Sequence, residues 1–174
     1  MINLTTPLNK KDIKALKAGD RVNISGVIYT ARDAAHKRIM EAIEKRLEVP
    51  FDLEGQLIYY VGPCPKRPGE VIGSCGPTTS GRMDKYAPAL HELGLMGTIG
   101  KGYRSESVRK SIEDNGCIYF LATGGAGALI AKKILSAEVI AYEELGAEAI
   151  WKLEVRDFPV VVGIDSSGCD IYEK

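Results

Sequence analysis

The chain has 174 residues, of which 45% are hydrophobic and 26% charged, and these proportions are typical of an ordinary folded domain. Its 23 basic residues are balanced by 23 acidic ones, so it lacks the positive surplus with which proteins bind nucleic acid or an acidic membrane surface. The length suits one domain, and we expect residues 1–174 to form it.

Short apolar runs rich in β-branched and aromatic residues alternate with amphipathic segments in the middle of the chain, which favours an α/β domain. The expected strands are residues 3–7, 22–29, 57–61, 95–99, 118–122, 139–142, 151–155 and 160–164. The expected helices are residues 12–18, 33–47, 82–93, 105–115 and 127–133. Because the strands near both ends have no long helix between them, we expect a mixed sheet, or two sheets that share one core.

Local signals mark several element ends. Ser105 precedes Glu106 at the expected start of one helix, and Asn115-Gly116 supplies a left-handed stop at its end.

Between two expected strands, residues 62–77 are dense in glycine and proline, which predicts a long ordered loop, and such loops are often functional.

The sequence shows no run of about 20 apolar residues that could span a bilayer, and residues 1–14 lack the apolar core of a signal peptide. We therefore expect a cytoplasmic protein. The four cysteines have no zinc-ligand spacing, so we expect free thiols and no metal bound by this chain; they are Cys64, Cys75, Cys117 and Cys169.

The first candidate site segment is residues 29–36, where an expected strand meets the clearest helix. Thr30 and Arg32 stand where side chains leave the sheet, and a guanidinium there can hold a carboxylate by two parallel hydrogen bonds. Asp33 is interpreted either as part of a site or as the cap of the helix. His36 is more typical of a surface or core histidine than of a catalytic base.

Two further segments place cations after expected strands. Residues 76–84 gather three hydroxyls, those of Thr78, Thr79 and Ser80, and Arg82 at an expected helix start, where an anion can be held; the alternative is an ordinary cap with a surface arginine. Lys101 is flanked by glycines, which makes it either accessible to a ligand or a solvated loop lysine.

The fourth segment, residues 122–130, partly imitates a dinucleotide-binding fingerprint, with Glu143 further along the chain. Ile130 stands where that fingerprint needs Gly or Ala, so the signal for a nucleotide is weak. Taken together, the segments offer cations for an anion but neither a metal set nor a paired carboxylate beside them, which is half of an active site.

The runs at residues 76–84, 100–102 and 122–128, with the Gly163-Ile164-Asp165-Ser166 ending, resemble the β-subunit, or C-terminal domain, of class I iron–sulfur fumarate hydratases and their L-tartrate dehydratase relatives. The resemblance implies a swivelling β/β/α domain with a mixed β-sheet core and flanking helices. It also implies a hetero-oligomer, in which an α-subunit carries a [4Fe-4S] cluster on three cysteines of its own with one iron open to substrate. None of the four cysteines of this chain is then a cluster ligand.

The resemblance also assigns roles by position. Arg32 and Arg82 match arginines that bind the substrate carboxylates, and Lys101 matches a substrate-binding lysine. Thr78 matches a threonine that removes the proton beside a partner aspartate, and it is either that base or only a substrate contact. The acid that helps hydroxide leave is expected on the partner, not at His36 or His91.

The expected activity is the reversible hydration of fumarate to (S)-malate, carried out together with the α-subunit. L-tartrate dehydration to oxaloacetate is the alternative within the family. A stand-alone module that binds a dicarboxylate or a nucleotide is the alternative outside it.

Overall fold

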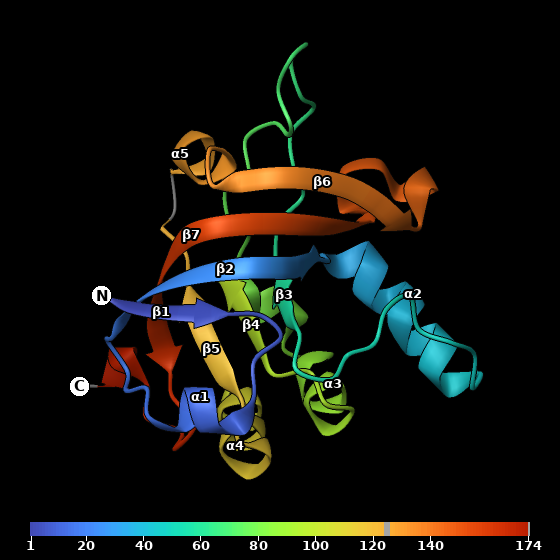
Figure 1. Cartoon of the computed structure of the whole chain (residues 1–174). Helices are drawn as coiled ribbons and strands as arrows, with labels where there is room; N and C mark the ends of the chain where they lie inside the picture. The colour runs from blue at the N-terminus through green and yellow to red at the C-terminus, as the bar shows by residue number, and fades with distance from the viewer. Residues whose placement is uncertain (124–125, 174) are drawn as a thin grey trace.

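The structure, a computed structural model, describes residues 1–123 and 126–173. Within this part the strands form a seven-stranded mixed sheet with flanking helices, which confirms the expected α/β class (Figure 1). The strands are β1 (Ile2–Thr5), β2 (Arg21–Thr30), β3 (Leu57–Tyr59), β4 (Gly97–Gly100), β5 (Ile118–Leu121), β6 (Ile134–Ala141) and β7 (Ile150–Ile164).

The sheet closes on itself through its longest strand. Strands β2, β3, β4 and β5 are parallel neighbours in that order, and β7 runs antiparallel to both β5 and β2. Hydrogen bonding therefore forms a ring, and β1 and β6 extend it at β2 and β7. In Figure 1, strands β6, β7, β2 and β1 cross the view as one layer, and β3, β4 and β5 run down behind it.

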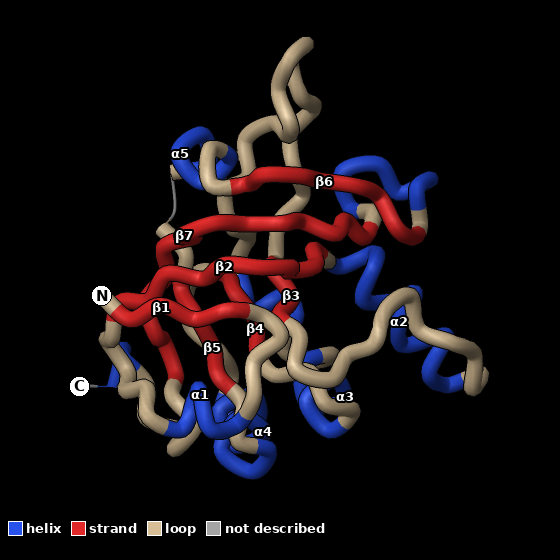
Figure 2. The backbone as a smooth tube through the Cα atoms, in the orientation of Figure 1, coloured by secondary structure: helices blue, strands red, loops and turns tan. Residues whose placement is uncertain are grey.

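Helices cover the outside of this ring (Figure 2). The α-helices are α1 (Lys10–Lys14), α2 (Asp33–Glu44), α3 (Ala87–Glu92), α4 (Glu106–Asn115) and α5 (Gly127–Ala131), and the 3-10 helices are η1 (Ser80–Met83), η2 (Glu143–Glu148) and η3 (Ile171–Glu173). The long glycine- and proline-rich loop predicted after the third strand is present between β3 and η1, and part of it projects beyond β6. No helix in the described part is both long enough and apolar enough to cross a bilayer.

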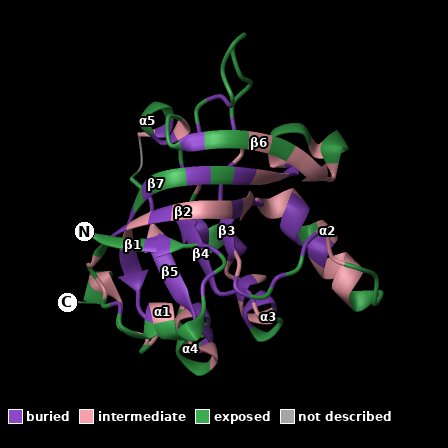
Figure 3. Cartoon of the chain, viewed as in Figure 1, coloured by how far each residue is buried: buried purple, intermediate pink, exposed green. Residues whose placement is uncertain are grey.

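The core lies between the strand layers and under the helices (Figure 3). The largest cluster of buried side chains fills the ring, with Ile28, Tyr59 and Phe158 among its members. A second cluster packs α2 against the sheet through Ala35 and Ile39. The strands are thus packed on one face by the cluster inside the ring and on the other by the cluster under α2, and such close packing keeps the strand ends in fixed positions.

The predicted signals at the ends of α4 are confirmed. The Ser105 hydroxyl accepts a hydrogen bond from the Val108 N–H at 3.3 Å, and Gly116 ends the helix in the left-handed conformation with φ of 64°. Glycine adopts that conformation at little cost because it has no Cβ atom.

Several expected boundaries were wrong. The two strands expected at residues 151–155 and 160–164 are the single strand β7, which continues past Asp157 at a φ of 52° because it pairs first with β6 and β2 and then with β2 and β5. The expected helix at residues 82–93 is split into η1, a turn and α3. Pro88 explains the restart, because proline is tolerated in a first helical turn but not inside a helix.

Candidate active site

The carboxyl ends of β2, β3 and β4 bring the predicted site segments together. Neighbouring parallel strands end at the same edge of a sheet, so Arg32 after β2 and Lys101 after β4 emerge on one edge. Thr78 is held there by its N–H, which donates to the Tyr60 carbonyl at 2.8 Å just beyond β3. Thr79 forms an isolated parallel bridge with Lys101, which places the hydroxyl-rich segment beside the lysine.

Asp33 joins the two predicted arginines. Its Oδ2 atom lies 2.9 Å from Arg82 Nη2 and 4.0 Å from Arg32 Nη2. Asp33 is not the cap of α2, because Arg32 occupies the N-cap position with extended backbone and the Ala34 N–H of the first turn donates to Glu148 Oε1 at 3.3 Å. The expectation of Asp33 as a cap is therefore wrong, and the carboxylate faces the arginines instead.

The environment of Arg32 leaves part of its guanidinium without a protein partner. Arg32 is 26% exposed, and among the described residues its buried Nε atom has no hydrogen-bond acceptor. Gly62 makes room for the side chain, since a Cβ atom there would lie 3.1 Å from Arg32 Cδ and Nη1. Unsatisfied buried donors are rare, and they are candidates for a ligand contact.

His36 supports the backbone of Arg32 from the core. Its Nδ1 atom lies 2.7 Å from the Arg32 carbonyl oxygen, so this nitrogen carries the proton and donates it. Burial lowers the pKa of His36 to about 4, so the ring is neutral near pH 7. His36 is fully buried beneath the site, in agreement with its interpretation as a core residue.

The three hydroxyls of the second segment have different surroundings. Ser80 is buried, its N–H donates to the Lys101 carbonyl at 2.9 Å, and a Cβ atom at Gly100 would lie 2.0 Å from Ser80 Oγ. Glycine at position 100 is therefore what lets Ser80 lie against the end of β4. Thr78 is half-buried and Thr79 is exposed, so these two remain accessible.

The structure does not place an α-helix start at residues 76–84, where the sequence predicted that a helix N-terminus could hold an anion. The segment that carries Arg82 is η1, a 3-10 helix of four residues, so it has no appreciable macrodipole to offer an anion. Positive charge comes instead from the side chains. Arg82 is 52% exposed and Lys101 is exposed, so this edge is open to solvent.

Other candidates from the sequence have structural explanations or fall outside the structure. Thr30 is buried, and its Oγ1 accepts a hydrogen bond from the Trp151 N–H at 3.1 Å, which ties β2 to β7. Gly124 and Gly125 of the fingerprint-like segment lie outside the described residues. Gly127 packs against the long loop, since a Cβ atom there would lie 2.3 Å from Ser74 Oγ, and Glu143 is an exposed residue of η2.

The described residues contain no group of three or more His, Cys, Asp or Glu side chains that could hold a metal ion. Cys64 and Cys169 are exposed free thiols, whereas Cys75 and Cys117 are buried. Burial raises the pKa of Cys117 to about 11, which keeps this thiol protonated near pH 7.

Sequence reasoning assigned no role to Arg104, three residues after Lys101. Its guanidinium is completely buried, with its Nε atom 2.6 Å from Asp84 Oδ1. An arginine in a loop between a strand and a helix is normally exposed, so no pattern in the sequence predicted this burial. Only the packing of the neighbouring strands reveals it.

The family model for the fumarase C-terminus matches residues 1–174. Over 173 residues the chain is 42% identical to the putative L(+)-tartrate dehydratase subunit beta of Methanocaldococcus jannaschii, covering 96% of this chain and 89% of that protein. It is 37% identical to fumarate hydratase 2 of Leishmania major and 36% identical to the anaerobic class I fumarate hydratase of Escherichia coli (strain K12). These matches cover 99% of this chain but only 31% and 32% of the two fumarate hydratases.

Proposed function

The chain belongs to the fumarase C-terminus family, and from this we propose that it is the β-subunit, or the corresponding C-terminal part, of a class I hydro-lyase that reversibly hydrates fumarate to (S)-malate. One observation carries the proposal beyond the family match. Arg32 and Lys101 follow β2 and β4 at one edge of the sheet, and Arg82 of η1 is paired there with Asp33, so that three cationic side chains are at least partly exposed on this side.

The charge of this edge suits a small dicarboxylate. Arg32, Arg82 and Lys101 bring three positive charges, and Asp33 removes one of them through its ion pairs. The remaining two match the two carboxylates of fumarate or malate. A guanidinium can hold each carboxylate by parallel hydrogen bonds, and Lys101 can add a third point of contact.

The same cations would favour the reaction as well as binding. Removing a proton from the carbon beside a malate carboxylate increases the negative charge on an already dianionic substrate. Guanidinium and ammonium groups preorganised around it stabilise that charge more strongly in the transition state than in the ground state. This difference is what accelerates the step.

We assign to Thr78 contact with the substrate and, beside a partner aspartate, removal of the proton. The threonine is half-buried, and its backbone is fixed by the hydrogen bond to Tyr60. An ordinary hydroxyl is a poor base near pH 7, so this role requires that nearby cations favour its deprotonated form.

The described residues do not fit an iron–sulfur cluster, because no three ligand side chains gather among them. We propose that the α-subunit carries a [4Fe-4S] cluster, which would act as a Lewis acid on the departing hydroxyl. The open edge supports such a partner, because exclusion of water strengthens every charge interaction in an active site. The relatives agree in two ways: the Methanocaldococcus protein is named a subunit, and the two fumarate hydratases are much longer than the matched part.

L-tartrate dehydration to oxaloacetate is the second candidate. The 42% identity to a protein named as a putative tartrate dehydratase subunit favours it, and the match covers 89% of that protein. Tartrate differs from malate by one further hydroxyl, so the same cations would hold it.

The deciding experiment is anaerobic co-expression with the α-subunit, followed by assays on fumarate and L-tartrate side by side. We expect turnover of fumarate by the complex and none by the iron-free isolated chain. Turnover of L-tartrate but not of fumarate would mean that L-tartrate is the substrate and that the fumarate assignment is wrong. Turnover by the isolated chain would refute the division of labour, and tight binding of NAD to that chain would favour a stand-alone nucleotide-binding module.

A further inference from the structure

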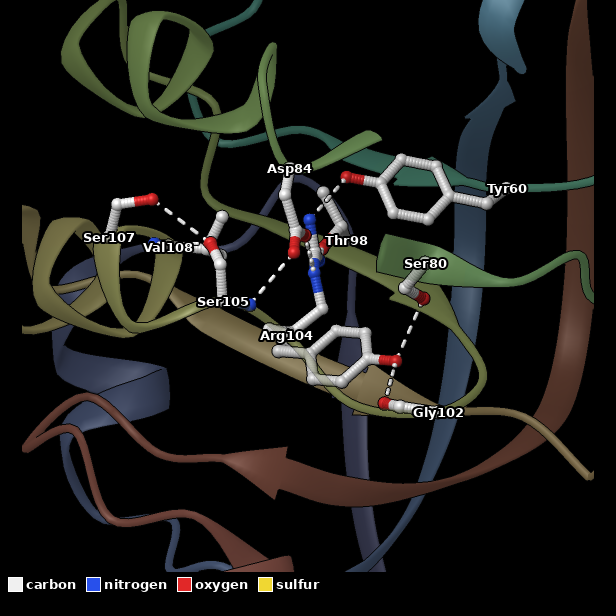
Figure 4. Close-up of polar contacts among 10 residues, drawn as sticks. Tyr60, Ser80, Asp84, Thr98, Gly102, Arg104, Ser105, Ser107 and Val108 are labelled. Carbon is white, nitrogen blue, oxygen red and sulfur yellow. Dashed lines mark hydrogen bonds and ion pairs between the residues drawn. The ribbon is translucent and has the colours of Figure 1, made fainter. Parts of the chain in front are cut away.

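Arg104 is a buried cation whose hydrogen-bonding groups point in three directions (Figure 4). Its side chain is 0% exposed, and its Nε donates to Asp84 Oδ1 at 2.6 Å. Nη1 donates to Thr98 Oγ1 at 3.0 Å, and Nη2 donates to the Tyr60 hydroxyl at 3.3 Å. A buried charge is costly unless it is paired and hydrogen-bonded, and Arg104 meets that condition on every side.

Two aromatic rings complete the enclosure of this guanidinium. Its Cζ atom lies 5.3 Å from the centroid of the Tyr60 ring and 4.8 Å from that of Tyr119. Arginine stacks on aromatic faces in this way, and the contact is stronger where water is excluded. The guanidinium is thus held in one position and orientation.

The Tyr119 hydroxyl extends the network to the loop that follows β4. It lies 2.9 Å from the Gly102 carbonyl and 2.7 Å from Ser80 Oγ. A carbonyl oxygen can only accept, so Tyr119 donates to Gly102, and the Ser80 hydroxyl can donate to Tyr119.

Each hydrogen-bond partner of Arg104 is either close in sequence to a residue of the proposed site or hydrogen-bonded to one. Asp84 is two residues after Arg82, and Thr98 is three residues before Lys101. Tyr60 accepts the N–H of Thr78 at its carbonyl. One guanidinium therefore connects the three segments that carry the threonine, the second arginine and the lysine.

Asp84 carries the connection one step further. Its second oxygen, Oδ2, accepts the Ser105 N–H at 2.7 Å. The carboxylate thus clamps the end of η1 to the loop that joins Lys101 to α4. If these segments moved independently, the cations would have no fixed separation from each other.

We propose that Arg104 is a positioning residue of this site: it holds Lys101 and the segment from Thr78 to Arg82 in register, so that their charges meet a dicarboxylate in one geometry. The proposal rests on the proposed function. Arg104 is not a catalytic residue, because its buried side chain cannot touch substrate. A lysine could keep the charge but could not reach Asp84, Thr98 and Tyr60 together, because its single ammonium lacks the planar fork.

The first test measures backbone hydrogen exchange in the full chain carrying Arg104→Lys. Two amides report on the connection directly: the Thr78 N–H bonds to Tyr60, and the Ser80 N–H bonds to Lys101. We expect these two to exchange at least tenfold faster, while the amides between β4 and β5 keep their protection. Unchanged exchange of both reporters, or a uniform increase across the sheet, would overturn the proposal.

Two control variants separate positioning from general effects. Arg109→Lys makes the same substitution on α4, where the guanidinium pairs with Glu173 near the surface. Ile13→Ala removes a buried side chain of α1 and lowers stability within the largest core cluster, which contains neither Tyr60 nor Tyr119. Neither control should release the Thr78 and Ser80 amides selectively.

The second test uses the complex with the α-subunit. Arg104→Lys should lower kcat/KM at least tenfold, with a fall in kcat, whereas both controls stay within twofold of wild type. Wild-type kinetics for Arg104→Lys, or an equal loss in Ile13→Ala at the same Tm, would refute positioning. If the wild-type complex turns over no dicarboxylate, the proposed function fails, and the exchange measurement still decides the role of Arg104.

If Arg104→Lys does not fold, the hydrogen-exchange measurement is made on Thr98→Val instead. It preserves the side-chain shape and removes only the acceptor of Nη1. We expect the same two amides to be released by a smaller factor, and their full protection would count against the proposal.

Discussion

Acidification should destabilise this protein through two buried histidines before its carboxylates titrate. His36 and His91 are both buried, and burial lowers the pKa of each from 6.5 to about 4. Between these two values the unfolded chain binds a proton at each histidine and the folded chain does not. Stability is therefore full above about pH 6.5 and falls as the pH drops toward 4.

The size of the effect follows from the two pKa values. From pH 7 to pH 5, each histidine should lower the free energy of unfolding by about 2 kcal/mol, and the pair by about 4 kcal/mol. Domains of this kind have total stabilities of about 5–15 kcal/mol, so the loss is a large share of the whole. The transition should be visible well above the pH at which acid unfolds most proteins.

The measurement is urea unfolding at pH 7, 6 and 5 for wild type and for His91→Gln. His91 lies outside the proposed site, where its Nδ1 contacts Ser111 Oγ at 2.9 Å. We expect the variant to be less stable at pH 7 but to lose only about half as much stability on acidification. Comparing slopes rather than absolute stabilities removes the contribution of carboxylates common to both proteins.

The reasoning is refuted if His91→Gln keeps the full wild-type slope between pH 7 and pH 5. Direct titration of the imidazole resonances provides an independent check. Both rings should remain neutral at pH 5.5, and a midpoint near 6.5 for either would mean that the ring is solvated.

Further predictions concern the site and its frame. Arg82→Ala should lower kcat/KM of the complex by the equivalent of about 2–5 kcal/mol with little change in Tm, and wild-type kinetics would remove this residue from the site. Lys101→Ala should behave likewise, whereas a change confined to thermal stability would make it structural. Gly100→Ala should be destabilising in thermal melts, because the new methyl group meets Ser80 Oγ, and an unchanged Tm would contradict the close approach. Ser105→Ala should lower the free energy of unfolding by about 1 kcal/mol through loss of the α4 cap, as urea titration can check.

Local patterns predicted those parts of the fold that depend on neighbouring residues. The period of residues 33–47 indicated α2, and Ser105 and Gly116 marked the ends of α4, because capping and left-handed turns involve only a few consecutive residues. The roles of Arg32, Thr78, Arg82 and Lys101 stay predictions. Arg32 and Lys101 come to one edge because β2, β3 and β4 are parallel neighbours, an order that the sequence indicated only as alternating strands and helices.

Two features depended on distant contacts. The sequence suggested Asp33 as a helix cap, but in the structure it pairs with Arg82, 49 positions along the chain, because η1 lies against the start of α2. The two predicted C-terminal strands became β7, because separate partners on each side continue its hydrogen bonding. Neither outcome can be read from a window of neighbouring residues.

The sequence by itself determined the class of fold, the family and the set of cations, because periodicity, turn residues and side-chain charge are properties of short segments. Tertiary structure alone decided which charges are exposed and which are enclosed. Lys101 and Arg104 are three residues apart and both basic, yet one is open to solvent and the other is sealed between Tyr60 and Tyr119. That difference arises because the burial of a side chain depends on strands and helices brought together from across the chain.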